Sequence, residues 1–152
     1  MERKWWTLIA VCIGTFMLLL DVTIVNVALP ALQTSLKASF SDLQWVVDAC
    51  ALMLAALLLT TGSLADLFGR RRVFVIGLII FSLSSLLSGL ASSPLWLNLA
   101  RGAQGVGGAA MFSTSLALLG SAFQGRERGT AFGARGALTG LAVRSGPWSA
   151  GR

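Results

Sequence analysis

Three charged side chains lie inside long apolar stretches of this sequence, where a charge is costly. Asp21 interrupts the run FMLLLDVTIVNVALP, which extends from Phe16 to Pro30. Asp48 and Arg101 interrupt two later apolar runs in the same way. An unpaired charge near the middle of a bilayer costs about 2.5–3.5 kcal/mol on insertion scales, so such residues usually face a protein interior and serve a function. Two acids and one arginine suit proton transfer or recognition of a charged ligand.

The apolar runs predict membrane-spanning helices, each of which needs about 20 apolar residues. Four runs are complete, at about residues 6–29, 43–64, 73–91 and 95–119, and a truncated fifth covers about 130–148. Pro30 and Pro94 lie at predicted span boundaries, where a helix tolerates proline best. The predicted fold class is an all-α membrane protein in which residues 1–152 form part of one domain.

Composition supports the membrane assignment and excludes several functions. The chain is 55% hydrophobic and only 12% charged, whereas a soluble domain carries roughly twice that charged fraction. It has no histidine, and both cysteines lie in apolar runs, so we expect no disulfide framework, metal or cofactor. No nucleophile–base pair or phosphate loop indicates an enzyme. The net charge of +6 comes mostly from loop arginines, which favours topology signals over nucleic acid binding.

The basic residues predict the orientation of the spans. Arg3 and Lys4 precede the first span, three arginines at 70–72 follow the second, and Arg126 and Arg128 follow the fourth. All these ends share one side of the membrane, and Lys37 is the basic residue between the first two spans. Because cytoplasmic loops carry an excess of Lys and Arg, we expect a multi-pass plasma membrane protein with a cytoplasmic N-terminus.

The three intramembrane charges are expected at similar depths. At a rise of about 1.5 Å per residue, Asp21 lies roughly 12 Å below the outer end of its span, Asp48 roughly 8 Å and Arg101 roughly 9 Å. This agreement predicts one shared polar site. The alternative for Asp21 and Arg101 is an ion pair that only locks two helices. Asp48 is also close enough to the interface to reach headgroup water.

Small residues concentrate in the fourth span, in RGAQGVGGAAM from Arg101. The pairs Gly105/Ala109 and Ala103/Gly107 have the small-xxx-small spacing that lets membrane helices approach closely. No β-strand precedes this glycine run, so the residues do not favour a dinucleotide site.

A very short cytoplasmic loop joins the second and third spans. It reads GSLADLFGRRRVF from Gly62. Gly69 permits a tight reversal of the backbone. Asp66 can attract the positive N-terminal end of a nearby helix, and the arginines can pair with Asp66 or with a helix C-terminus.

Three motifs together resemble the major facilitator superfamily. GSLADLFGRRR resembles the loop signature of that family and departs from it at Leu67, where arginine is frequent. LDVTIVNVALP from Leu20 resembles the first-span signature of the fourteen-span drug:proton antiporters, and RGAQGVGGAAM resembles their fourth-span signature. The resemblance covers residues from about 5 to about 142 and implies the N-terminal part of a multidrug efflux antiporter.

The resemblance also implies roles for individual residues. Asp21 would be the protonatable acid of a central cavity, and Asn26 a polar residue near it. Arg101, which begins the motif that contains Gln104, would stabilise the deprotonated acid, since a nearby cation favours the charged form. Asp48 would suit cationic substrates. An inner latch that biases alternating access would contain Gly62, Asp66, Gly69, Arg70 and Arg71.

The fifth span departs from the antiporter pattern. Gly146 and Pro147 keep the Gly-Pro core of the family's fifth-span signature. Two of the four glycines of that signature are missing, and Arg135 and Arg144 interrupt what should be apolar helix. Either arginine could reach the interface by extending its side chain.

The predicted function is export of lipophilic, often cationic, compounds in exchange for protons. The partners would be the proton, a drug-like molecule, membrane lipid, and further spans or partner helices; nucleic acid is not among them. A facilitator needs two six-helix halves, so we expect the chain to be a fragment that is inactive alone. The alternatives are a facilitator of another small-molecule class and a non-transporting membrane protein that packs with partner helices.

Overall fold

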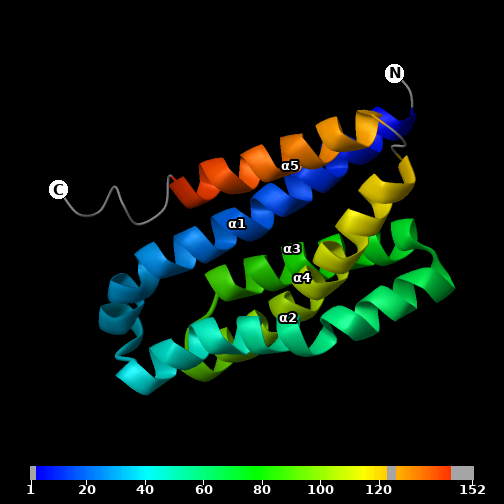
Figure 1. Cartoon of the computed structure of the whole chain (residues 1–152). Helices are drawn as coiled ribbons and strands as arrows, with labels where there is room; N and C mark the ends of the chain where they lie inside the picture. The colour runs from blue at the N-terminus through cyan, green and yellow to red at the C-terminus, as the bar shows by residue number, and fades with distance from the viewer. Residues whose placement is uncertain (1–2, 123–125, 145–152) are drawn as a thin grey trace. The chain divides into compact units, whose positions relative to one another are not determined.

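Five α-helices follow one another along the chain. The computed structural model describes residues 3–122 and 126–144. The helices, shown in Figure 1, are α1 (Arg3–Leu36), α2 (Phe40–Phe68), α3 (Arg70–Gly89), α4 (Pro94–Ala122) and α5 (Arg126–Arg144). Their order confirms the all-α prediction. Gly146 and Pro147 lie outside the described residues, so their role in a fifth-span motif stays a prediction.

Local sequence signals explain where α2 and α4 begin. Lys37 adopts a left-handed conformation with φ of 48°, which ends α1 and turns the chain. The Ser39 hydroxyl then accepts a hydrogen bond from the Asp42 backbone N–H at 3.2 Å, and the Asp42 carboxylate accepts one from the Ser39 N–H at 3.0 Å. This reciprocal capping box satisfies two N–H groups of the helix start. At α4, Pro94 occupies the first helical position, as predicted, where its missing N–H does no harm.

Pro30 lies inside a helix, so the span boundary predicted there does not coincide with a helix end. α1 continues through Pro30 to Leu36. A proline inside a helix removes one backbone donor and normally kinks or ends it. One turn later the Thr34 hydroxyl donates to the Ala31 carbonyl at 2.9 Å. At about 1.5 Å per residue, the 34 residues of α1 are roughly 51 Å long, well beyond the roughly 30 Å of a hydrocarbon core.

Three of the described helices are long and apolar enough to cross a membrane: α1 over Trp5–Leu36, α2, and α3. α4 has 29 residues, which is long enough to cross a membrane. α5 has 19 residues and an arginine in its last turn. The count of four complete spans therefore stays a prediction.

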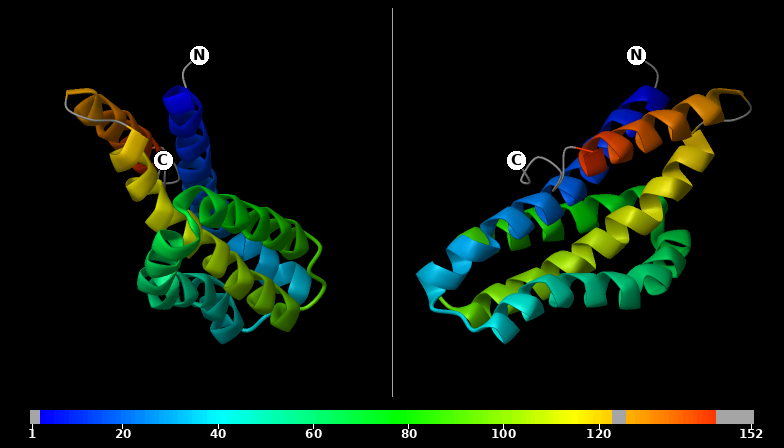
Figure 2. Two further views of the ribbon diagram at one scale, coloured as in Figure 1. Left: turned by 90° about the vertical axis from the view of Figure 1, so that its right-hand side faces the viewer. Right: turned by 60° about the vertical axis from the view of Figure 1, so that its left-hand side comes forward.

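The chain divides into two compact units. One unit contains residues 25–114, and the other contains residues 1–24 and 115–152. In the first unit α4 passes between α2 and α3, as Figure 2 shows. A small buried cluster of Ala65, Val73 and Ala110 brings the three helices together. In the other unit, the first part of α1 and α5 run in the same direction (Figures 1 and 2), with Val11, Leu119 and Ala131 buried.

Candidate functional site

Among the charged residues that the sequence analysis predicted to be functional and that the structure describes, Arg101 is the most buried. Its fractional exposure is 4%. Its Nε donates to the backbone carbonyl of Val46 on α2 at 3.3 Å. Its Nη1 donates to Oε1 of Gln104, one turn further along α4, at 2.6 Å. Gln104 is itself fully buried. Because a buried charge needs hydrogen-bond partners to offset its lost hydration, these contacts explain how α4 carries a permanent cation at depth.

Close approach of the helix backbones makes the Arg101 contact possible. A Cβ atom at Gly105 would lie 2.5 Å from the Cys50 carbonyl oxygen on α2. On the opposite side, a Cβ at Gly107 would lie 2.6 Å from the Phe81 nitrogen and 2.7 Å from the Gly77 oxygen of α3. Only glycine leaves room for backbones at these separations.

The two small-xxx-small pairs differ, because Ala103 is exposed whereas Gly107, Gly105 and Ala109 are buried. Gly105 faces α2 and Gly107 faces α3, whereas Ala103 is exposed and Ala109 is fully buried. The glycine of α3 that opposes Gly107, Gly77, is the partner that the sequence did not reveal. Both glycines are engaged within the chain, so neither is left for a partner helix.

Asp48 lies on an exposed surface of α2, two residues beyond the carbonyl that Arg101 contacts. It lines a pocket of about 400 Å³ between the last part of α1 and the start of α2. The pocket is mostly apolar, with one carboxylate and two amides, and its lining consists of Leu29, Pro30, Gln33, Phe40, Leu43, Gln44, Val47 and Asp48. The continuation of α1 through Pro30 supplies two of these residues, Pro30 and Gln33. A lipophilic molecule with a positive group would match this lining.

Asp21 and Asn26 lie on α1, on either side of the division between the two units. Asp21 is half-buried and belongs to the unit of residues 1–24 and 115–152, while Asn26 is exposed and belongs to the other. Arg101 and Asp48 belong to the unit of residues 25–114. The shared polar site of Asp21, Asp48 and Arg101 stays a prediction.

The loop between α2 and α3 consists of Gly69 alone, which has φ of +94°. Its N–H donates to the Ala65 carbonyl at 3.0 Å, and its carbonyl accepts from Arg72 and Val73. Asp66 pairs across this turn with Arg70, whose Nη2 and Nε lie 3.1 and 3.2 Å from Asp66 Oδ1. The predicted pairing of Asp66 with an arginine of this loop is thus present.

The other two members of the predicted latch flank this turn. Gly62 lies one turn before Asp66, and a Cβ atom there would meet Ser113 Cβ of α4 at 4.0 Å, an ordinary contact. Arg71 is exposed at the start of α3. Next to Gly62, the Thr61 and Ser113 hydroxyls lie 3.2 Å apart and link α2 to α4.

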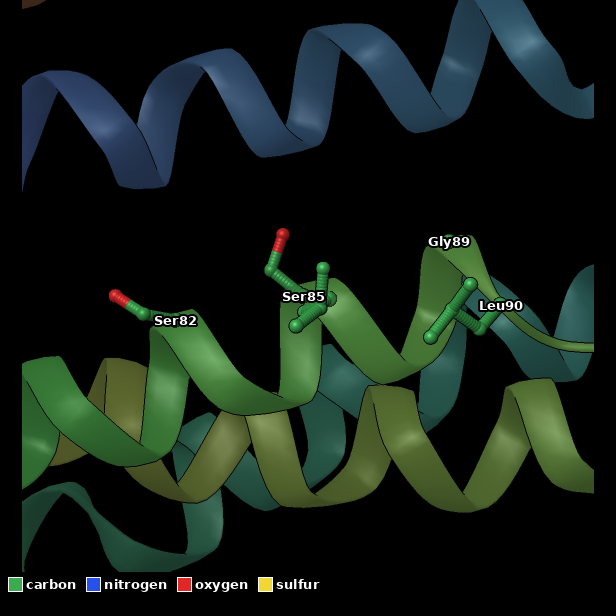
Figure 3. Close-up of a pocket in the computed structure, with 5 residues that line it drawn as sticks. Ser82, Ser85, Gly89 and Leu90 are labelled. Carbon is green, nitrogen blue, oxygen red and sulfur yellow. The ribbon is translucent and has the colours of Figure 1, made fainter.

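Polar groups that the sequence reading did not single out also appear in the spans. The Asn98 Oδ1 atom, one turn before Arg101, is buried and lacks a hydrogen-bond partner among the described residues. The sequence feature that could have identified Asn98 is a polar residue within an apolar run. A separate shallow pocket follows one face of α3, where Ser82, Ser85 and Gly89 recur at helical spacing and the two hydroxyls point away from the ribbon of α4 (Figure 3).

Arg135 lies within α5 and contacts α4. Its Nη2 donates to the Ser115 hydroxyl of α4 at 3.2 Å, and Ser115 is only 2% exposed. Extension of the Arg135 side chain toward the membrane interface stays a prediction.

Comparison with known proteins identifies the family. The family model of the Major Facilitator Superfamily matches residues 11–151. The chain is similar to the puromycin resistance protein of Streptomyces alboniger (45% identity, 91% of this chain, 28% of the relative) and to a multidrug resistance protein of Mycobacterium tuberculosis (46%, 93% and 26%). It is also similar to a riboflavin transporter of Clostridioides difficile (37%, 97% and 32%).

The chain spans about a quarter to a third of the length of these relatives. Drug and antibiotic exporters recur among them, and the all-helical structure is consistent with the N-terminal bundle of such proteins. The family is one of transporters, so the chain is not an enzyme. The match over nearly the whole sequence places this protein in the Major Facilitator Superfamily.

Proposed function

We propose that this chain is the N-terminal part of a proton-coupled exporter of lipophilic, often cationic, compounds in the plasma membrane, with its N-terminus in the cytoplasm. The observation that carries the proposal is the buried Arg101, held by Gln104 and by the Val46 carbonyl. A permanent cation fixed at this depth is useful where an acid has to release a proton inside a membrane, because it favours the charged form of that acid. Similarity to named drug and antibiotic exporters supports the same conclusion.

In this proposal Asp21 carries the coupling proton, with Asn26 as a neighbouring polar residue on α1. Asp48 receives the positive group of the substrate, because its carboxylate lies in a mostly apolar pocket of drug-like size. Gln104 positions Arg101. These roles assign the permanent charge, the titratable charge and the substrate contact to different residues.

The inner latch would consist of Gly62, Asp66, Gly69, Arg70 and Arg71. The Asp66–Arg70 pair is half-exposed, so it contributes little to stability. Its use would lie in favouring one state of the alternating-access equilibrium over the other. The antiporter signature at Gly146 and Pro147 would belong to the same machinery.

Transport requires two helical halves around a site near the midplane, and the relatives are three to four times longer than the chain. We therefore expect these five helices to work with further spans and to be inactive alone. The remaining partners are the proton, the exported molecule and membrane lipid.

A chimera tests the proposal. Residues 1–144 are joined to the remaining spans of the Streptomyces alboniger relative and expressed in an efflux-deficient host. Asp21→Asn should abolish drug resistance and drug-induced proton release at normal expression, while Asp21→Glu should retain both in part. Asp42→Asn, at the start of α2, is the matched control. Unchanged proton release in Asp21→Asn would show that Asp21 is not the coupling acid.

A facilitator of another small-molecule class is the second candidate, favoured by the similarity to a riboflavin transporter. Uptake and efflux of a metabolite panel by the same chimera would decide between the two. Accumulation changes for a vitamin but for none of the drugs would support this candidate.

A further inference from the structure

The pocket at Asp48 contains more polar groups than attraction of a positive charge requires. Two carboxamide side chains, Gln33 of α1 and Gln44 of α2, line the same pocket as Asp48. The other lining side chains are apolar, namely Leu29, Pro30, Phe40, Leu43 and Val47. All these residues belong to the compact unit of residues 25–114. The two amides therefore bear on the kind of cation that the pocket accepts.

Two helices supply the polar groups of this pocket. Gln44 and Asp48 are four residues apart within α2, and side chains at this spacing are neighbours on one face of a helix. Gln33 lies in the last turn of α1, which ends at Leu36. It lines the pocket from the other helix because α1 continues past Pro30. A bound cation would thus meet acceptor oxygens from both helices.

The number and type of acceptors match a primary ammonium group. One carboxylate and two carboxamides offer an acceptor oxygen on each of three side chains, and a primary ammonium has three N–H donors. A quaternary ammonium has no N–H group, and proteins recognise it with cages of aromatic rings. Phe40 is the single aromatic residue among the described residues of the lining. The methyl groups of a quaternary ion would also displace water from the amide oxygens without replacing its hydrogen bonds, which is unfavourable.

We propose that Gln33 and Gln44 make this pocket selective for primary ammonium groups over quaternary ones, while Asp48 supplies the negative charge that attracts both. The inference rests on the proposed export function and narrows its substrate class to lipophilic primary amines. The apolar lining contacts the lipophilic body of the molecule, for which a pocket of about 400 Å³ has room.

Two pyrene cations test this preference, 1-pyrenemethylammonium and (1-pyrenylmethyl)trimethylammonium. They share the aromatic body and a single positive charge at neutral pH, and they differ in their N–H donors. The purified 152-residue chain is placed in phosphatidylcholine vesicles. Binding is followed by energy transfer from the five tryptophans to pyrene, at equal membrane-bound concentrations of the two probes.

The primary ammonium should bind about tenfold more tightly, which corresponds to about 1.4 kcal/mol. Gln33→Met and Gln44→Met, which keep the length of the side chain and remove its acceptor, should each reduce the preference to about threefold. The double variant should abolish it, and Asp48→Asn should weaken the binding of both probes. Thr34→Val, next to Gln33 but outside the lining, should leave the preference unchanged. Helicity measured by circular dichroism shows whether each variant is folded.

Equal affinities of the two probes for the unchanged chain would overturn the proposal, as would a preference that survives in the double variant. Vesicles that contain phosphatidylethanolamine, whose headgroup is also a primary ammonium, test the source of the ligand. Unchanged affinity for the probe supports an exported amine, whereas a lower affinity would assign the pocket to the lipid headgroup instead.

The binding measurements require no transport, so they fail or succeed independently of the export function. Equal affinities would contradict the selectivity of the pocket alone. Proton release that persists in the Asp21→Asn chimera would contradict proton coupling alone.

Discussion

The packing of α3 against α4 yields the sharpest quantitative prediction, through Gly107→Ala. A Cβ atom at this position would lie 2.6 Å from the Phe81 nitrogen and 2.7 Å from the Gly77 oxygen. Both obstacles are backbone atoms, which cannot rotate away. Ordinary contact begins at 3.4 Å, so the two helices have to separate by about 0.8 Å.

A gap of this size forfeits between a quarter and a half of the dispersion attraction at each contact that it opens. Overpacking destabilises a protein by about 1–3 kcal/mol. Because the obstacles are backbone atoms, we expect Gly107→Ala to lie at the upper end, about 3 kcal/mol. The higher helix propensity of alanine offsets about 1 kcal/mol of this loss. We therefore expect a net loss of about 2 kcal/mol in the free energy of unfolding.

Gly102→Ala is the matched control on the same helix. Its Cβ would meet only the Met53 Cγ atom, at 4.0 Å, so it should be neutral or stabilising by up to about 1 kcal/mol. Unfolding by sodium dodecyl sulfate in mixed micelles, followed by the fluorescence of the five tryptophans, measures both variants. If the Gly107→Ala variant were as stable as the Gly102→Ala variant, the close contact of α3 and α4 would be refuted.

Further predictions concern the inner ends of the helices and the chain as a whole. Asp66→Asn should change the unfolding free energy by less than about 1 kcal/mol, yet lower drug resistance in the chimera; a large loss of stability would contradict a latch role. Gly69→Ala should cost about 1–3 kcal/mol because of its positive φ, whereas Gly89→Ala, with open space around it, should cost nothing. Cysteines replacing Thr61 and Ser113, whose oxygens lie 3.2 Å apart, should form a disulfide under mild oxidation, detected by gel mobility; no disulfide would exclude this register of α2 and α4. The 152-residue chain alone should leave the drug sensitivity of an efflux-deficient host unchanged.

The order of the helices could be predicted from the apolar runs, but their ends could not. The apolar run of the second span begins at Leu43, while α2 begins at Phe40 because Ser39 and Asp42 cap it. α1 continues past Pro30 to Leu36. Hydropathy measures where lipid contacts the chain, and helix ends depend on local hydrogen bonds instead.

The candidate site could be predicted only where a residue type reveals it. Arg101 was evident as a charge in an apolar run, and the pairing of Asp66 with an arginine followed from the loop composition. A partner of Arg101 on α2 is the backbone carbonyl of Val46. Every residue has a backbone carbonyl, so residue types could not predict this contact. Gly77 was missed because a single glycine in a helix does not show which neighbour it meets.

The link from Arg101 to Val46 also sets an order of events during synthesis. The two residues are separated by 55 positions, so at roughly 5–20 residues per second the acceptor emerges about 3–11 s before its donor. α2 can thus enter the bilayer first and offer a carbonyl to the arginine of α4 as that helix leaves the translocon. The costly charge of Arg101 then meets a hydrogen-bond acceptor that has already been synthesised.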